Sequence, residues 1–291
     1  MTSKGELPVS ERIRRQFSDL TRAERQLASS LLANYPVSGL GSITVLAQAA
    51  KVSTPTIVRM ARKLGFAGFQ DMQAHLRGEL EAAISNPIAK HDRWAEDAPD
   101  THMLNRFADA AMDNLRQTLS QIDPAVFDQV VSLMSDAKRR LHVVGGRITH
   151  SLADYLFTHM QVMRPDVSIL TAHAGTWPHF VLEMREGDLL CLFDIRRYEH
   201  DLERLAQMAK ARKVVIILFT DYWGSPVSNH ADHVFNARIE APSAWDSNIV
   251  LMLIVEALIA AVQNRTWAET QERMQVLEKL FDETRLFRKF T

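Results

Sequence analysis

The stretch from Thr54 to Lys63 carries side chains suited to contacting DNA. Two threonines, Thr54 and Thr56, are followed by Arg59, Arg62 and Lys63. At the start of a helix, hydroxyl and guanidinium groups can reach base edges in the major groove, whereas basic side chains further along hold phosphates. We therefore predict that Thr54, Thr56 and Arg59 contact bases, with a phosphate as the alternative partner of Arg59. Arg62 and Lys63 are the predicted phosphate contacts.

Two short helices separated by a tight break must position these side chains. Ser42 and Ser53 each stand where a side-chain oxygen accepts hydrogen bonds from the first free N–H groups of a helix. Pro55 fits a first turn because its missing N–H is not needed there, and Gly65 suits the end of the second helix. Apolar residues recur at spacings of three and four, so each helix has one face to bury. They are Leu46, Ala47 and Ala50 in the first segment and Ile57, Met60, Ala61 and Leu64 in the second.

These signals are typical of a helix-turn-helix, with a helical hairpin that has a solvated basic face as the structural alternative. Because helix N-termini also hold phosphates, Ser42 and Ser53 join the predicted DNA-binding residues. The charge distribution favours DNA binding. Residues 1–77 contain eleven lysines and arginines against five acids, a net charge of +6, whereas the whole chain carries −1. A basic segment joined to an acidic remainder is typical of a nucleic-acid-binding module with a partner domain.

A second group of candidate residues lies in the other half of the chain and suits an anion. Gly145-Gly146-Arg147-Ile148-Thr149 leaves a predicted strand and opens a helix, which directs free backbone N–H groups at a ligand. Asp194-Ile195-Arg196-Arg197-Tyr198 follows another predicted strand, and arginines there can grip a phosphate or carboxylate with paired hydrogen bonds. Thr220 and Ser225 offer hydroxyls to a polyol. The predicted ligand-binding residues are Gly145, Gly146, Arg147, Thr149, Asp194, Arg196, Arg197, Thr220 and Ser225.

Each of these features has a structural alternative. The two glycines can serve a tight strand-to-helix turn through their geometry alone. Asp194 can hold one of the two arginines in an ion pair while the other is solvated. Serine, threonine, aspartate and proline are also ordinary loop residues, so the segment around Thr220 and Ser225 carries little weight by itself.

Beyond residue 138, short apolar runs alternate with helical patterns, which predicts a parallel sheet covered on both faces. Ligands of such sheets bind beyond the carboxyl ends of the strands, where the second group of candidates lies. The predicted strands are 141–144, 167–170, 188–193, 214–219 and 232–239, and the predicted helices are 103–119, 123–134, 148–163, 177–184, 202–212 and 246–262.

The N-terminal part is predicted to be all-helical, with helices over 9–19 and 21–34, the two motif helices, and a fifth over 69–80. Thr21-Arg22-Ala23-Glu24 is a capping box that opens the second helix. Residues 85–100 lack periodicity and have the composition of a linker. We therefore expect a helix-turn-helix DNA-binding domain over 1–82, a linker over 83–100, and an α/β domain with a five-stranded parallel sheet over 101–291.

Several classes of protein are disfavoured by composition and motif content. One cysteine, Cys191, excludes an intrachain disulfide and a multi-cysteine metal site. The eleven histidines include no His-Glu-x-x-His, and Ser225 has no adjacent base that the sequence places in reach. The longest apolar run, 249–262, is interrupted by Glu256 and is too short to span a bilayer. We expect a cytoplasmic protein with no membrane segment, no metal, no cofactor and no catalytic residues.

The motif residues resemble a known family. The run from Leu20-Thr21 through Ile43-x-x-Leu46-Ala47 and Val52-Ser53-x-x-Thr56-Ile57-Val58-Arg59 to Arg62-Lys63-Leu64-Gly65-Phe66-x-Gly68-Phe69 is similar to the N-terminal domain of the MurR/RpiR bacterial transcriptional regulators. The second half resembles the sugar isomerase (SIS) domain of that family, which binds phosphosugars in relatives. The resemblance implies a DNA operator and a small-molecule effector, such as a phosphosugar or a sugar acid.

One departure from the SIS pattern bears on the effector. Phosphosugar-binding SIS domains typically carry Ser-x-Ser-Gly-x-Thr after the third strand, and here Asp194-Ile195-Arg196-Arg197-Tyr198 takes that place. Thr149 and the Thr220–Ser225 segment match the remaining hydroxyl positions. Either the arginines replace the missing loop, or the ligand is not a phosphosugar.

The sequence thus predicts a DNA-binding transcriptional regulator whose SIS domain senses a small sugar-like or acidic metabolite without converting it. A sugar-phosphate isomerase with a helical appendage is the alternative, but it needs an acid–base pair that the loops do not supply. A homodimer or higher homo-oligomer is expected, with the helix 246–262 and the tail 267–290 as candidate contact surfaces.

Overall fold

The structure, a computed structural model, describes residues 7–33, 35–84, 90, 102–171 and 173–287. Most of the predicted linker, residues 85–89 and 91–100, and the end of the predicted tail, residues 288–290, lie outside this part of the chain. Two units can be distinguished. The first comprises Met1–Asp100 with two short segments, Tyr222–Asn229 and Pro242–Trp245, and the second comprises Thr101–Asp221, His230–Ala241 and Asp246–Thr291.

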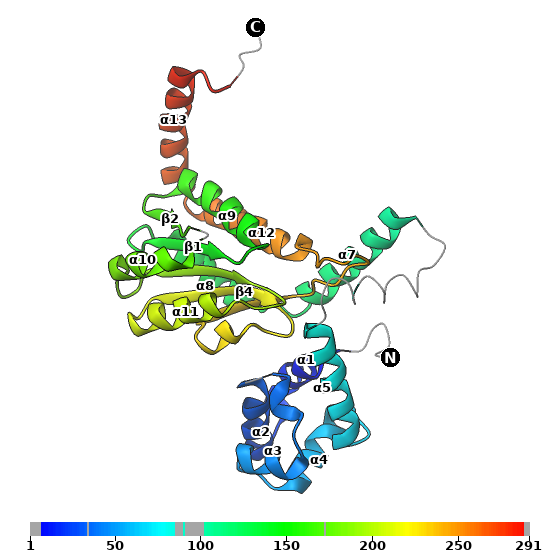
Figure 1. The fold of residues 1–291 in the computed structure, drawn as a ribbon. Coiled ribbons are helices and arrows are strands. Elements are labelled where there is room, and N and C mark those ends of the chain that lie inside the picture. The colour runs from blue at the N-terminus through cyan, green and yellow to red at the C-terminus, as the bar shows by residue number, and fades with distance from the viewer. Residues whose placement is uncertain (1–6, 34, 85–89, 91–101, 172, 288–291) are drawn as a thin grey trace. The chain divides into compact units, whose positions relative to one another are not determined.

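The first unit is helical and follows the predicted order of elements (Figure 1). The capping box forms as expected, because Thr21 N–H donates to Glu24 Oε2 at 2.8 Å and Glu24 N–H donates to Thr21 Oγ1 at 3.4 Å. The first helix is shorter than predicted, since the chain tightens into a 3-10 turn at Phe17–Asp19. The helices are α1 (Val9–Arg15), α2 (Arg22–Ala33), α3 (Ile43–Ala50), α4 (Thr54–Lys63) and α5 (Phe69–Ile84).

One hydrophobic core joins these helices, and a buried polar network lies beside it. Leu27 of α2, Leu46 of α3 and Met60 of α4 are almost completely buried in the same cluster. Glu79 of α5 accepts hydrogen bonds from Val9 N–H and from the Tyr35 hydroxyl. Because α1 and α5 are far apart in sequence, this carboxylate and the apolar core together fix the helices around the motif.

The second unit contains a five-stranded, all-parallel sheet in the order β2-β1-β3-β4-β5. The strands are continuously apolar because helices cover both faces, as the sequence predicts. The chain runs outward from β1 to β2 and then returns to the other side of β1, so β1 and β3 flank the point where the strand order reverses. The strands are β1 (Leu141–Gly145), β2 (Val167–Ile169), β3 (Leu189–Asp194), β4 (Val215–Asp221) and β5 (His233–Ala237).

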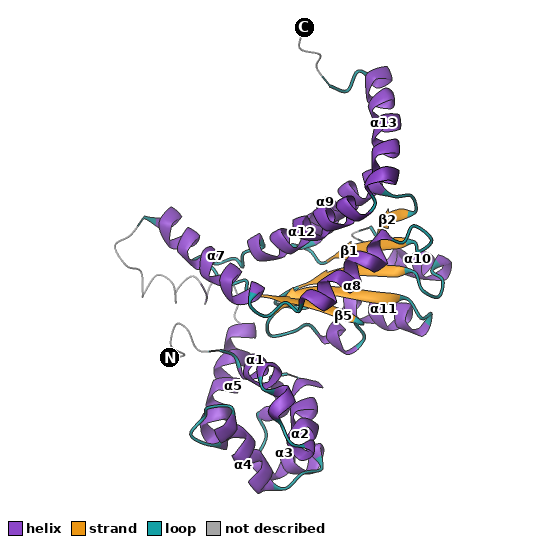
Figure 2. Cartoon of the chain, turned by 180° about the vertical axis from the view of Figure 1, so that it is seen from behind, coloured by secondary structure: helices purple, strands orange, loops and turns teal. Residues whose placement is uncertain are grey.

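Helices α9, α10 and α11 connect the first four strands in right-handed crossovers, so α9 and α11 lie on opposite faces of the sheet. Figures 1 and 2 show α9 and α12 together on one face and α10 with α11 on the other. The last helix, α13, packs against α9 only near its start and extends beyond the sheet (Figure 1). The helices are α7 (Met103–Leu119), α8 (Pro124–Ser135), α9 (His150–Met163), α10 (Trp177–Glu183), α11 (His200–Ala211), α12 (Ile249–Arg265) and α13 (Trp267–Thr284).

The predicted fold class is confirmed: a helical unit with the motif helices, followed by a five-stranded parallel sheet flanked by helices. Every predicted strand is present, with its ends shifted by at most two residues. Among the described residues, no single helix is long and apolar enough to cross a membrane. Only α12 and α13 taken together have the length and composition of a membrane span, and the chain bends by 98° between these two helices.

Candidate nucleic-acid interface and effector site

The start of α3 and the end of α4 follow their sequence signals. Ser42 caps α3, because its Oγ accepts the Val45 N–H at 3.3 Å. After α4, Gly65 adopts φ of +89°, a conformation that favours glycine, and Phe66 N–H donates back to Ala61 C=O at 3.0 Å. The start of α4 differs: the Ser53 Oγ lies 2.9 Å from Thr56 Oγ1 and caps no backbone N–H.

Thr56, which is predicted to contact a base, is not on the exposed face of α4. Thr56 is only 4% exposed and lies on the same face of α4 as Ile57 and Met60. Its hydroxyl is within hydrogen-bond distance of Ser53, and the Arg59 Nη2 donates to it at 3.4 Å. Thr56 therefore acts within α4, where it helps to orient Arg59, and does not present a free hydroxyl to solvent.

The basic side chains of α4 fall into two groups. Arg59 and Arg62 are exposed, and the side chain of Arg62 makes no hydrogen bond or ion pair with any described residue. Lys63, by contrast, donates to the Asp19 carbonyl at 2.5 Å and lies 3.2 Å from Glu24. Burial raises the pKa of the Glu24 carboxyl, but hydrogen bonds from Thr21 and Lys63 outweigh burial and lower the pKa below its usual value. Lys63 thus ties α4 to α2 and is only partly available to a phosphate.

Two further basic residues of the first unit are used for structure. The Arg12 guanidinium donates to Leu64 C=O at 3.1 Å and lies 4.4 Å from the centre of the Phe66 ring. Arg25 donates to Leu20 C=O at 2.8 Å. The positive charge counted from the sequence therefore overstates the charge that is free to meet DNA. Exposed basic residues close to the motif include Arg22 and Lys51, which the sequence analysis did not assign.

The second candidate site lies at the carboxyl ends of β1 and β3, where open parallel sheets bind ligands. Gly145 ends β1, and a Cβ there would lie 2.6 Å from Thr149 C=O, so the tight turn requires glycine. Thr149 is 2% exposed, and its hydroxyl donates to Phe193 C=O at 2.8 Å. The hydrogen bond from Thr149 to Phe193 therefore holds the turn before α9 against β3.

The sequence predicts that the backbone N–H groups at this turn are free to bind an anion. In the structure, two of them are already used. The Arg147 N–H donates to Glu199 Oε1 at 2.7 Å, and Gly146 N–H donates to Phe193 C=O at 3.1 Å. A carboxylate of the chain occupies the position expected for an anionic ligand. The sequence analysis missed Glu199, although a glutamate at a helix N-cap is unusual enough to have been a signal.

Arg196 is predicted to bind the ligand, but its side chain does not extend into the proposed site. Its side chain is 4% exposed and lies 3.4 Å from Asp246 and 3.6 Å from Glu240. The structural alternative, an ion pair with one arginine solvated, fits better, although these two ion-pair partners come from beyond β5. Arg197 is exposed and has φ of +68°. The two arginines therefore do not form a joint clamp.

Buried carboxylates organise the loop after β3. Asp221 Oδ2 accepts the Arg196 N–H at 2.7 Å, and Asp221 Oδ1 accepts the Tyr198 hydroxyl at 2.7 Å. Burial, and then the Asp221 charge, raise the pKa of Tyr198 well above its usual value, so the phenol stays protonated and donates. Asp194 Oδ1 accepts the Glu199 N–H at 3.3 Å. These carboxylates are committed to holding the loop, which leaves them poorly placed for acid–base chemistry.

The remaining predicted ligand residues, Thr220 and Ser225, do not belong to the loops after β1 and β3. Thr220 is fully buried within β4, beside Asp194 of β3. Ser225 belongs to the segment 222–229 of the first unit, where its Oγ accepts the Val227 N–H at 3.1 Å. Of the predicted ligand-binding set, the structure brings together the residues of the β1 and β3 loops.

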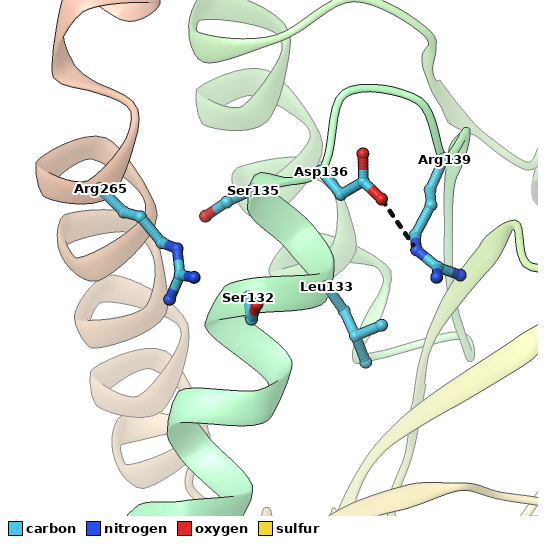
Figure 3. Close-up of a pocket in the computed structure, with 6 residues that line it drawn as sticks. All are labelled: Ser132, Leu133, Ser135, Asp136, Arg139 and Arg265. Atoms are coloured by element: carbon cyan, nitrogen blue, oxygen red, sulfur yellow. Dashed lines mark hydrogen bonds and ion pairs between the residues drawn. The ribbon is translucent and has the colours of Figure 1, made fainter.

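A separate pocket of about 390 Å³ lies near the opposite end of the sheet, between the C-terminal ends of α8 and α12 (Figure 3). Its Asp136 and Arg139 side chains are paired at 3.2 Å. None of the predicted ligand-binding residues lines it. The lining residues are Ser132, Leu133, Ser135, Asp136, Arg139 and Arg265.

Metal and thiol chemistry find no support in the described part of the chain. No group of three or more histidine, cysteine, aspartate or glutamate side chains is arranged to hold a metal there. Cys191 is completely buried in β3, and burial raises the pKa of its thiol to about 12. A thiol with so high a pKa is a poor nucleophile.

Comparison with known proteins agrees with this two-part architecture. Residues 8–83 match the helix-turn-helix domain of the rpiR family, and residues 133–261 match the SIS domain. The chain thus has a DNA-binding type of domain followed by a sugar isomerase type of domain. It carries a helix-turn-helix domain of the rpiR family, followed by a SIS domain.

Similar proteins include regulators of the same layout. The HTH-type transcriptional regulator HexR of Pseudomonas aeruginosa is 24% identical over 94% of this chain and 96% of its own length. The sugar isomerase domain of an RpiR transcription factor from Sphaerobacter thermophilus covers 60% of this chain and 97% of that domain, with 24% identity and a TM-score of 0.57. The Vibrio vulnificus NanR protein complexed with ManNAc-6P covers 96% of this chain and 99% of that one, with 18% identity and a TM-score of 0.57. The names of these relatives support a regulatory rather than an enzymatic role.

Proposed function

We propose that the protein is a transcriptional regulator that binds a DNA operator through residues 1–82 and senses a small sugar-like metabolite through residues 101–291. The observation that carries the DNA-binding half is the exposed pair Arg59 and Arg62 on α4. Arg59 is oriented by Thr56, and α4 is anchored at its end by Lys63 and Arg12. A helix held this firmly keeps its side chains in defined positions in the major groove. Sequence-specific recognition requires such defined positions.

Base and phosphate contacts are then divided along α4. Thr54 and Arg59 lie in the first two turns and face the base edges, whereas Arg62 and the N-terminal ends of α3 and α4 hold phosphates. Lys51, in the turn between the two helices, is exposed and adds a phosphate contact. The protein acts where its operator DNA is, in the cytoplasm.

The effector site in this proposal is the carboxyl edge of β1 and β3. Two observations support it. The strand order reverses between these strands, and hydrogen bonds from the Arg147 N–H to Glu199 and from the Glu199 N–H to Asp194 join their loops. The sugar phosphate bound by the NanR relative makes a sugar derivative the natural class of ligand to test. Effector binding changes operator affinity only through its preference for one of two states of the protein, typically about 1–3 kcal/mol of coupling.

Pairing of two chains completes the proposal. Regulators of this type gain affinity by placing two helix-turn-helix modules on half-sites about one helical turn apart. Large apolar side chains on α13 are left exposed. Val276 at 54% and Leu280 at 48% lie four residues apart on one face, and Trp267 at 49% is at the start of the helix. Thr270 is the buried residue of that helix. Such an apolar face is typical of a surface that contacts another protein, and we assign it to a second copy of this chain.

The experiment that tests the function starts from genomic DNA. Purified protein is incubated with sheared genomic fragments, the bound fragments are sequenced, and the recovered site is titrated in the presence of sugars, sugar phosphates and sugar acids. We expect a small set of sites with a shared motif, and an affinity that one ligand shifts. Uniform recovery of fragments without a motif would contradict the regulator proposal.

A further inference from the structure

The side chain of Glu199 joins the two loops of the proposed effector site. Glu199 precedes α11, at the end of the loop after β3, yet its Oε1 accepts the Arg147 N–H from the loop after β1 at 2.7 Å. Residues at helix N-caps normally use their side chain on their own helix, and Glu199 makes no such cap. Its carboxylate therefore serves the neighbouring loop, at the point where the strand order reverses.

The local backbone is built around this carboxylate. A Cβ on Gly146 would lie 2.8 Å from Glu199 Oε1, so the approach of the carboxylate depends on glycine at that position. The backbone of Glu199 is itself fixed, because its N–H donates to Asp194 Oδ1 at 3.3 Å, and Asp194 is 2% exposed. The contact is therefore supported from both sides.

The charges around Glu199 also disfavour an anion. Asp201 and Glu203 lie in the first turn of α11. Arg196, the buried cation of the same loop, is already opposite Asp246 and Glu240. A ligand phosphate or carboxylate at this turn would meet the fixed carboxylate of Glu199 and would lack the help of Arg196. The exposed cations of the two loops are Arg147 and Arg197.

We propose that Glu199 is a specificity-determining residue of the effector site: it fills the anion position at the β1 turn and so excludes phosphate and carboxylate groups from it. The effector then presents neutral hydroxyl groups to this turn, and Glu199 accepts hydrogen bonds from them. This inference rests on the effector site proposed above. It reverses the expectation from the sequence that the two loops attract an acidic metabolite.

The test measures anion binding without DNA. The full-length protein and its Glu199→Ala, Glu199→Gln and Glu203→Gln variants are titrated with inorganic phosphate by calorimetry. Folding of each is checked by circular dichroism and thermal unfolding. Because an interaction with a charged group is worth about 1.5–3 kcal/mol, Glu199→Ala is expected to bind phosphate roughly ten- to a hundredfold more tightly than the unmodified protein. Glu199→Gln loses the charge but still fills the position, so a smaller gain is expected.

Two controls locate the effect. Glu203→Gln removes the same charge from the same helix end without touching Arg147, so its gain in phosphate affinity should be much smaller than that of Glu199→Ala. Adding Gly146→Ala to Glu199→Ala places a Cβ where the carboxylate approached, and it should abolish the gained phosphate binding. A folded Glu199→Ala protein that binds phosphate no more tightly than the unmodified one would overturn the proposal, as would an equal gain in Glu203→Gln. Neither result depends on operator binding, so failure here and failure of the regulator proposal are separable.

Discussion

The two candidate sites use arginine in opposite ways. On α4, Arg59 and Arg62 remain exposed, and the structural work is done by neighbours such as Lys63 and Arg12. In the loop after β3, Arg196 is buried between Asp246 and Glu240. The comparison teaches that a basic residue in a suggestive place becomes a binding group only when no carboxylate elsewhere in the chain is packed against it.

The largest effect is expected from removing Arg196, the buried arginine of this comparison. Arg196→Ala removes the cation that lies 3.4 Å from Asp246 and 3.6 Å from Glu240, and we expect the second unit to lose about 3 kcal/mol of unfolding free energy. That figure is at the lower end for a buried pair because Glu240 is partly exposed. Arg197→Ala is the matched control, since its side chain is exposed, and it should change stability by less than about 0.5 kcal/mol. Chemical denaturation of both variants measures the difference. Equal stabilities would show that the ion pairs of Arg196 do not hold the loop.

The next effect concerns base recognition. Arg59→Ala is expected to weaken binding to the cognate site by about 1–3 kcal/mol while leaving random DNA nearly unaffected. Fluorescence anisotropy with a labelled cognate duplex and a scrambled duplex gives both affinities. A loss that is the same on both duplexes would make Arg59 a phosphate contact.

A smaller effect separates two adjacent basic residues of α4. Arg62→Gln should weaken binding to all DNA sequences alike and reduce the slope of log affinity against log salt by about one. Lys63→Gln should leave that slope largely unchanged and instead lower the stability of the first unit by about 1 kcal/mol, because Lys63 is bonded to Asp19 and Glu24. Salt titrations of binding and thermal melts distinguish the two. A full unit of slope lost in Lys63→Gln would return that residue to the phosphate contacts.

The smallest effect is a pH dependence in the sheet. Burial lowers the pKa of His142 below its ordinary value of 6.5, with Asp188 opposing this shift. The folded protein therefore resists protonation while the unfolded chain takes up a proton. The contribution of His142 to stability is complete above pH 6.5 and is lost as the pH falls toward the lower pKa of the folded state. Unfolding measured on both sides of pH 6.5 should show this loss, and His142→Gln should flatten it. An unchanged pH profile in the variant would assign the effect to other groups.

Local signals in the sequence were enough to predict most of the fold. The Thr21–Glu24 capping box, the Ser42 cap and the turn at Gly65 depend on residues a few positions apart, and all three form as predicted. The strands were found because continuously apolar runs mark a sheet covered on both faces. Their order then placed the β1 and β3 loops together.

The sites were less predictable because their partners are distant in sequence or differ by a small rotation of a helix. Arg196 is paired with residues more than forty positions away, and no local pattern shows that packing. Glu199 reaches a loop fifty-two positions earlier. Thr56 was misplaced because a residue at the edge of a helix face can turn inward when its hydroxyl finds an internal partner, here Ser53.

The central claim is that α4 gives this protein a preference for one DNA sequence. Competition anisotropy at physiological salt, with the site recovered from genomic DNA against a scrambled duplex of equal length, measures that preference directly. The account predicts that the recovered site is bound at least about a thousandfold more tightly than the scrambled one, and that Arg59→Ala reduces this ratio. Equal affinities for the two duplexes, or a ratio that Arg59→Ala leaves intact, would contradict the assignment of α4 as the recognition helix.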